Sequence, residues 1–383
     1  MNRRDLFRQL FGGLVGAGTI IESGFYRAAL ARAMAPAAAG SKLFDIVKVA
    51  EGVFMARART QAFINANSAI FVNSHDVLVV DTHTKPSAAA SLAAQIKQEI
   101  TTKPVRYIVN THFHDDHVQG NSTFKAEAEG AKVDFIAHEA TKKLMEEEVP
   151  RRLNATLDNF PREIERVRKF VSDAKSADEK SFWNDQIRQI EAFRAEMAHF
   201  SLELPTITLD KSYVIKDRDH DLHIEFHGHA HTAGDVVVFC PQKRAIATGD
   251  MIHAGLPYMP DSYPRAWPRT IDSVGQLDFT RILPGHGDVM KDREMMLGMR
   301  DYLDELVMMV EAGKKAGKTV EEMQESITME TMKSLKAHQF GERAIEHRAQ
   351  IHTHWGNTYL WALPFQNSLN SNTRRVYKYL DRV

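Results

Sequence analysis

A dense group of histidine and aspartate residues in the first third of the sequence can bind metal. His112, His114, Asp116 and His117 lie in the segment Thr-His-Phe-His-Asp-Asp-His. Neutral imidazole nitrogens and carboxylate oxygens are ligands that zinc and similar metals prefer. In an extended segment, residues i and i+2 point to the same side, so the first two histidines can bind one ion. Asp116 and His117 come after a turn and can face a second ion nearby. A histidine-rich surface patch is the alternative interpretation, and the ligand spacing favours the metal site.

The segments before this group predict elements that can position it. Apolar runs at 77–81 and 105–109 predict two buried strands, and the apolar spacing over 85–99 predicts a helix between them. The ligand group then follows the second strand of a strand-helix-strand unit. This carboxyl end of the sheet is where α/β proteins usually build their sites.

Four segments, read in order, resemble the metallo-β-lactamase fold superfamily. The first, His112-Phe113-His114-Asp115-Asp116-His117, matches the family's H-x-H-x-D-H motif. The later three are Gly228–Asp235 with His231, Ala-Thr-Gly-Asp with Asp250, and Leu-Pro-Gly-His-Gly with His286. The resemblance covers residues 43–295. It implies an α/β fold, a four-layer αββα sandwich, in which many different chemistries occur.

The resemblance also implies a two-metal site. One ion would be held by His112, His114 and His231, the other by Asp116, His117 and His286, with Asp250 bridging both. We expect two Zn²⁺ ions per chain, with iron or manganese as alternatives. Such a pair can lower the pKa of a shared water to about 7, so a bridging hydroxide attacks without a side-chain nucleophile. Asp116 would also be catalytic, orienting the hydroxide and carrying a proton to the leaving group.

The preferred function is a dinuclear zinc-dependent metallohydrolase acting on a small molecule that contains an ester, lactone, thioester or β-lactam. Asp250 resembles the bridging carboxylate of the glyoxalase II-like and lactonase branches, which typical β-lactamases do not use. One alternative is a phosphodiesterase-type metallohydrolase, and another is a non-haem iron oxidoreductase on the same fold. A net charge of −1 and a pI of about 7.0 give no attraction to nucleic acid or to an anionic membrane.

Several residues around the ligands are candidates for support or substrate binding. Asp81 lies where relatives place a supporting carboxylate, and Thr232 with Asp235 can hold the loop that carries His231. His229 is one position off the ligand pattern. The loop 254–268, rich in proline and aromatic residues, can be either a substrate loop or a self-packed connection. Its candidates for substrate contact, together with the nearby His253, are Tyr258, Tyr263, Arg265 and Trp267.

The amino-terminal residues 1–35 resemble a twin-arginine signal peptide. Paired Arg3 and Arg4 precede an apolar stretch, Leu10 to Ile21, that is too short to span a bilayer. We therefore expect export of the folded chain by the twin-arginine machinery, a periplasmic location and no stable membrane anchor. The single cysteine, Cys240, lies in a strand-like apolar run and is expected in the core.

Two stretches look like additions to the core fold. Residues 139–200 show apolar side chains at helical spacing within a highly charged segment, which predicts an insertion of two or three amphipathic helices. Residues 296–383 predict a helical extension, in which a helix from about 295 ends at Gly313 and Gly317. Thr319 and Glu322 then have the spacing of a capping box.

Overall fold

The computed structural model describes residues 42–59, 63–350, 354–355, 358–359 and 365–381. The predicted signal peptide over residues 1–35 lies outside these ranges. Within them, no helix combines the length and apolar character needed to cross a membrane.

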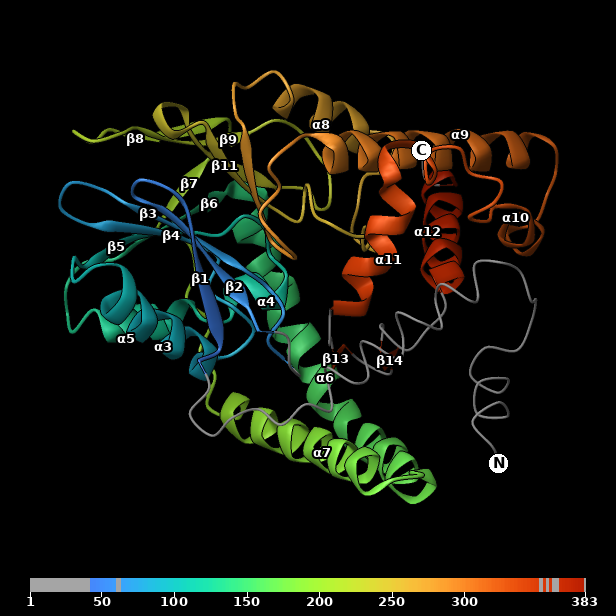
Figure 1. Ribbon diagram of the computed structural model, residues 1–383, viewed down its shortest axis with the longest axis horizontal. Coiled ribbons are helices and arrows are strands. Elements are labelled where there is room, and N and C mark those ends of the chain that lie inside the picture. Colours follow the sequence, from blue (N-terminus) through green and yellow to red (C-terminus); the bar gives the residue numbers. More distant parts are fainter. Residues whose placement is uncertain (1–41, 60–62, 351–353, 356–357, 360–364, 382–383) are drawn as a thin grey trace.

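Two β-sheets form the centre of the molecule (Figure 1). The first has the strand order β1-β2-β3-β4-β5-β6-β7 and the second β12-β11-β10-β9-β8. The strands of the first are β1 (Phe44–Ala50), β2 (Val53–Ala58), β3 (Ser68–Val72), β4 (Val77–Val80), β5 (Val105–Val109), β6 (Asp134–His138) and β7 (Ile207–Leu209). Those of the second are β8 (Ser212–Ile215), β9 (Leu222–Phe226), β10 (Val236–Cys240), β11 (Ala245–Gly249) and β12 (Arg281–Pro284).

The predicted strand-helix-strand unit before the first ligands is confirmed. β4 pairs with β5 in parallel, and the chain between them forms α3 (Pro86–Gln95), which continues as a short π-helical turn, η1 (Ile96–Ile100). Strand β6 pairs in parallel on the far side of β5. β5 is therefore an inner strand of the sheet, and the ligand loop that follows it begins between the ends of β4 and β6.

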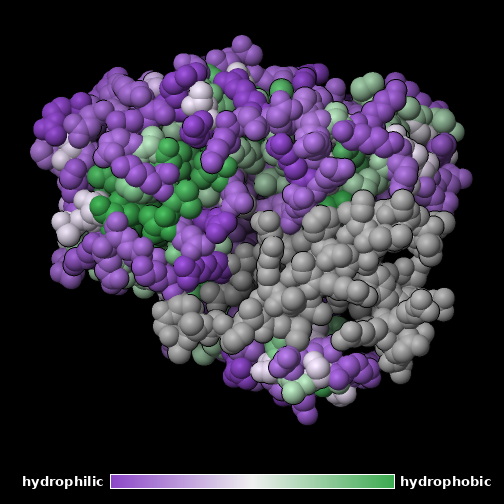
Figure 2. All heavy atoms as spheres, in the orientation of Figure 1, coloured by the Kyte–Doolittle hydropathy of each residue, from purple (hydrophilic) through white to green (hydrophobic). Residues whose placement is uncertain are grey.

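Helices cover the outer faces of both sheets, so the predicted αββα sandwich is confirmed. The inner faces pack on each other through apolar side chains such as Leu78, Val109 and Val238, and Cys240 is buried there as expected. α3 and α5 (Asn121–Glu127) cover the first sheet, while α8 (Trp267–Val274) and α9 (Glu294–Lys315) cover the second. On the face shown in Figure 2, hydrophobic side chains gather over β3 and β4.

The predicted helical insertion consists of two helices, α6 (Glu139–Asp173) and α7 (Ala177–Met197). They pack against each other through side chains that include Phe160, Ile190 and Phe193. The first turns of α6 instead contact the metal-loop region, where Met145 and Val149 pack on Phe113 and Val118. The insertion therefore contacts the core through the first turns of α6 and also through α7, where Glu196 accepts from Ser87 of α3 and Phe193 stacks on Phe63.

The carboxyl-terminal extension is helical, as predicted. After α9 come α10 (Val320–Ser326), η3 (Ala337–Gln339), α11 (Phe340–Gln350), a small hairpin of β13 (His354–Trp355) and β14 (Thr358–Tyr359), and α12 (Phe365–Leu380). The capping box of Thr319 and Glu322 is present. The predicted end of α9 at Gly317 is confirmed, because the helix ends at Lys315 and Gly317 follows with a left-handed φ of 75°, whereas Gly313 lies inside the helix. The absent side chain of Gly313 instead leaves room for Met323 of α10.

Candidate metal centre

The predicted metal ligands converge at one edge of the sandwich. Loops that follow β5, β9, β11 and β12 carry most of them, and the short helix α4 (Asp115–Val118) carries two. The residues are His112, His114, Asp116, His117, His231, Asp250 and His286, and all are buried. They form three overlapping groups, and the ligand atoms of each group lie within 4.8 Å of one another. Two of these groups are the two predicted sets of three ligands.

The hydrogen bonds of His112 and His117 leave one nitrogen of each ring without a partner. In His112 the Nδ1 contacts the hydroxyl of Thr111 at 3.0 Å, and the buried Nε2 has no partner. In His117 the Nδ1 donates to Asp81 Oδ2 at 2.8 Å, and Nε2 is again buried without a hydrogen bond. Buried nitrogens without partners are costly unless something else binds them. The site therefore fits a metal ion.

His114 and His286 each use one ring nitrogen for an outward hydrogen bond and turn the other towards the ligand cluster. The Nε2 of His114 donates to Asp261 Oδ2 at 2.8 Å, while its Nδ1 faces His231 Nε2 at 3.0 Å. The Nδ1 of His286 donates to the backbone oxygen of Asn65 at 3.1 Å, while its Nε2 faces Asp116 and Asp250. In metal sites the outward hydrogen bond fixes the ring and its tautomer.

Asp250 lies between the two predicted ligand sets. Its Oδ1 is 3.5 Å from His117 Nε2, and its Oδ2 is 3.6 Å from His231 Nε2 and 3.3 Å from His286 Nε2. Asp116 Oδ2 is 3.3 Å from His286 Nε2 and 3.6 Å from His117 Nε2. The carboxylate of Asp250 thus reaches ligands of both sets, as a bridging residue must.

The charges in the site favour a bound cation. Burial and the neighbouring imidazoles lower the pKa of His112 and His231 well below its usual value, so these rings stay neutral. Burial acts against charge on His117 as well, but the carboxylates of Asp116, Asp81 and Asp250 raise its pKa to about 9. Burial also acts against charge on His286, but the carboxylates of Asp250 and Asp116 raise its pKa well above the usual value. Without metal these rings hold protons, and a divalent ion would replace that positive charge.

The supporting role expected for Asp81 is confirmed. Besides His117, its carboxylate accepts hydrogen bonds from the backbone N–H and the hydroxyl of Thr111, each at 2.8 Å. The residue follows β4 with a φ of 65°, a left-handed conformation that asparagine and aspartate tolerate better than most residues. Asp81 therefore connects the end of β4 to the ligand loop after β5.

The loop carrying His231 is held as expected. Asp235 accepts from the backbone N–H of Thr232 at 2.7 Å and from its hydroxyl at 2.9 Å. Trp267 lies beside His231, with the ring centres 5.4 Å apart, and its indole N–H donates to Met251. His229 is exposed and belongs to none of the three ligand groups.

The residues expected to contact substrate lie in different surroundings. Tyr258 is exposed, with its ring centre 5.9 Å from that of His114, and His253 is buried with its ring centre 6.2 Å from that of His286. Tyr263 stacks on His229, and Arg265 pairs with Glu311 of α9. Trp267 is fully buried. Contact with substrate stays a prediction for all five residues.

Three further residues near the ligands were not predicted from the sequence. Asp261 and Arg152 form an ion pair beside His114, with Asp261 Oδ1 and Arg152 Nη2 2.7 Å apart. His347 of α11 is buried close to Gly255 and Gly287, which have no side chains to block its ring. Long-range pairing brings each of them to the site, and no local motif marks them.

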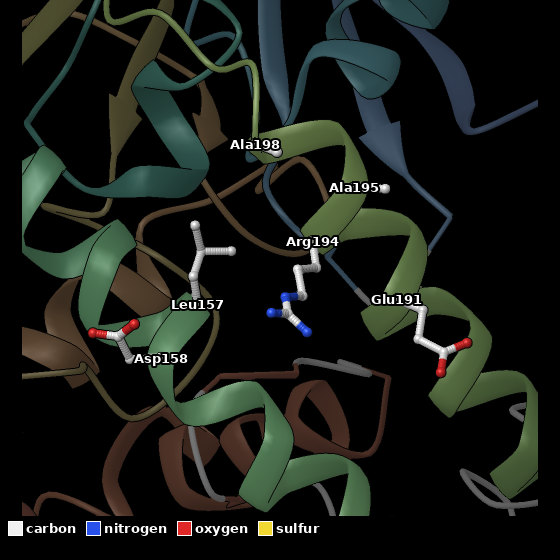
Figure 3. A pocket seen from close by; sticks show the side chains of 6 residues that line it. All are labelled: Leu157, Asp158, Glu191, Arg194, Ala195 and Ala198. Carbon is white, nitrogen blue, oxygen red and sulfur yellow. The ribbon is translucent and has the colours of Figure 1, made fainter.

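A groove between α6 and α7 is separate from this site. It has a volume of about 490 Å³, and Figure 3 shows Arg194 pointing into it. Its lining residues are Leu157, Asp158, Glu191, Arg194, Ala195 and Ala198. None of these is a predicted metal ligand, so the groove is not the metal centre.

The fold and the site together define a protein of the metal-binding αββα class. Residues 63–286 match the family model described as the metallo-beta-lactamase superfamily. The chain belongs to this superfamily, whose members are mostly metal-dependent hydrolases and include other activities as well.

Two solved structures are also similar. One is a metallo-beta-lactamase from Pontibacter korlensis, with 18% sequence identity, 68% of this chain and 99% of that chain covered, and a TM-score of 0.49. The other is a metallo beta lactamase from Hirschia baltica, with 18% identity, 68% and 98% covered, and a TM-score of 0.48.

Proposed function

We propose that the protein is a dinuclear zinc-dependent hydrolase that cleaves a carbonyl bond of a small molecule, in an ester, lactone, thioester or β-lactam. The position of Asp250 carries this proposal. Its carboxylate approaches His231 of the first ligand set and both His117 and His286 of the second set, at 3.3–3.6 Å. A carboxylate in this place can share its oxygens between two ions, as two-metal hydrolases require.

The side chains of the site support hydrolytic chemistry. Two divalent ions bound there would supply a water acidified towards neutral pH and a polarised substrate oxygen. The five histidines would hold the ions, and outward hydrogen bonds keep four of the rings from turning, those of His112, His114, His117 and His286. Asp116 faces the same space and can orient the attacking water and accept its proton. The burial of these groups limits bulk water, which strengthens each electrostatic interaction.

Tyr258 is the loop residue best placed to meet a substrate. It is 55% exposed, and its ring lies next to those of His114 and His231. Its hydroxyl can donate to a carbonyl oxygen. We expect Tyr258→Phe to lower kcat/KM about 10-fold or more while zinc content stays unchanged, a loss typical of one hydrogen bond to substrate. Met308→Ala, at an exposed position of α9, is the control and should change neither value.

Metal analysis and a substrate panel test the function. Protein purified without added metal should contain two zinc ions per chain. The panel comprises a nitrophenyl ester, a homoserine lactone, a chromogenic cephalosporin and bis-nitrophenyl phosphate. Turnover of a carbonyl substrate that is lost in Asp116→Asn supports the proposal. Turnover of the phosphate diester alone, or a content of iron in place of zinc, would refute it and favour one of the two alternatives.

We also propose that the enzyme acts in the periplasm. The paired Arg3 and Arg4 before a short apolar stretch support this location. Sequencing the amino terminus of protein from the periplasmic fraction tests it. A mature terminus near Pro36 is expected, and an intact Met1 in that fraction would refute cleavage of a signal peptide.

A further inference from the structure

We propose that Asp261 is a positioning residue for the ligand His114, and that the inserted helix α6 holds Asp261 in place through Arg152. This inference rests on the two-metal site of the proposed function. It gives the insertion a part in metal binding. It also gives the loop after Asp250 a role beyond contact with substrate.

The contact between Asp261 and His114 sets the state of the imidazole ring. Asp261 Oδ2 lies 2.8 Å from His114 Nε2, and a carboxylate can only accept in this pair. The proton is therefore on Nε2, and Nδ1 presents its lone pair to the cluster, where it lies 3.0 Å from His231 Nε2. Carboxylate partners of this kind orient histidine ligands and raise their basicity.

Arg152 fixes the other oxygen of the same carboxylate. Its Nη2 donates to Asp261 Oδ1 at 2.7 Å, and its Nε donates to Glu148 one turn earlier at 3.2 Å. The guanidinium also lies over the ring of Phe113, 4.8 Å from its centre. Phe113 lies between His112 and His114 in the first motif. One arginine of the insertion therefore contacts both the ligand loop and the carboxylate that orients His114.

Apolar packing holds this arginine in register with the site. Met145, Val149 and Arg152 are spaced four and three positions apart, so they share one face of α6. Met145 and Val149 are fully buried against Phe113 and Val118. The same helix face thus provides both the hydrophobic contact below the ligand loop and the ion pair beside it. Movement of α6 would displace Asp261 and with it the support of His114.

Zinc affinity measured on the full chain tests the inference without using enzymatic activity. Stepwise constants for two zinc ions are obtained by competition with a chromogenic chelator. We compare Asp261→Asn and Arg152→Met with the control Asp278→Asn. Asp278 also forms an ion pair with an arginine, Arg244, but on an exposed part of the chain. Circular dichroism and thermal unfolding report whether each variant is folded.

Asp261→Asn should weaken the binding of one zinc ion about 10- to 100-fold and leave the other unchanged. Arg152→Met should weaken the same ion by a smaller factor, because Asp261 can still reach His114. Asp278→Asn should bind as the wild type does. Equal constants in wild type and both test variants would overturn the inference, and so would an equal loss at both ions. If Asp261→Asn does not fold, Arg152→Met alone decides between these results.

The outcomes separate this inference from the proposed function. A wild-type chain that binds two zinc ions but hydrolyses no carbonyl substrate refutes the function, while the affinity test still applies. A wild-type chain that binds no zinc refutes both. Selective loss of one ion in Asp261→Asn supports the positioning role whatever the substrate is.

Discussion

Replacing Gly285 with alanine tests whether Asp250 is a metal ligand without substituting any of the ligand residues. Gly285 precedes His286, and its backbone has an ordinary negative φ, so the change acts through space alone. A Cβ at this position would lie 3.0 Å from His117 Cε1 and closer still to Asp250 Oδ1. Ordinary contact begins at 3.4 Å. The ligands must therefore move by about 0.4 Å or more, whereas metal–ligand distances hold within about 0.2 Å.

We expect Gly285→Ala to lower zinc affinity about 10- to 100-fold, the range seen when the residues that support a metal ligand are lost. Overpacking should also destabilise the fold by about 1–3 kcal/mol. Chelator competition gives the affinity, and chemical denaturation of the metal-free protein gives the stability. Gly275→Ala is the control, because its nearest contacts, at 3.2 and 3.3 Å, need only small shifts. Wild-type affinity for both ions in Gly285→Ala would refute the placement of Asp250 at the metals.

Three other predictions follow from the site and its support. Asp250→Ala should lose about one metal per chain by elemental analysis, and retention of two would contradict the bridging role. In the metal-free protein the raised pKa of His117, about 9, contributes stability that is complete below pH 6.5 and is lost as the pH rises through 9. The gain in Tm on adding zinc should therefore increase from pH 6.5 to 9, and a gain independent of pH would argue against proton displacement. Met145→Ala should cost about 2–5 kcal/mol in chemical denaturation because Met145 is fully buried, and a cost below about 1 kcal/mol would show that α6 does not pack firmly on Phe113.

The ligands and the core fold could be predicted because their signals are local. Two buried strands around a helix have distinct periodicities, and the chain that follows β5 carries four ligands within a few residues. The later ligands each follow a strand, so a common sheet edge brings them together. The two helices of the insertion could also be predicted, since apolar side chains recur along α6 and α7 at helical spacing.

The support of the site could not be predicted because it depends on distant contacts. Arg152 and Asp261 are far apart in sequence, and nothing in the helix or the loop shows that they pair. The sequence placed Trp267 in a loop that suggested substrate contact, yet it begins α8, its ring is fully buried and its N–H is bonded to Met251. An aromatic residue in a loop does not reveal whether it faces solvent or core. Packing of α11 brings His347 to the ligands in a similar way.

Anomalous scattering at the zinc edge from crystals of the full chain is the most direct test of the central claim. Two peaks about 3.5–4 Å apart are expected. One should be ligated by His112, His114 and His231 and the other by Asp116, His117 and His286, with Asp250 between them. A single peak, or two peaks that Asp250 does not join, would contradict the assignment of a dinuclear hydrolase.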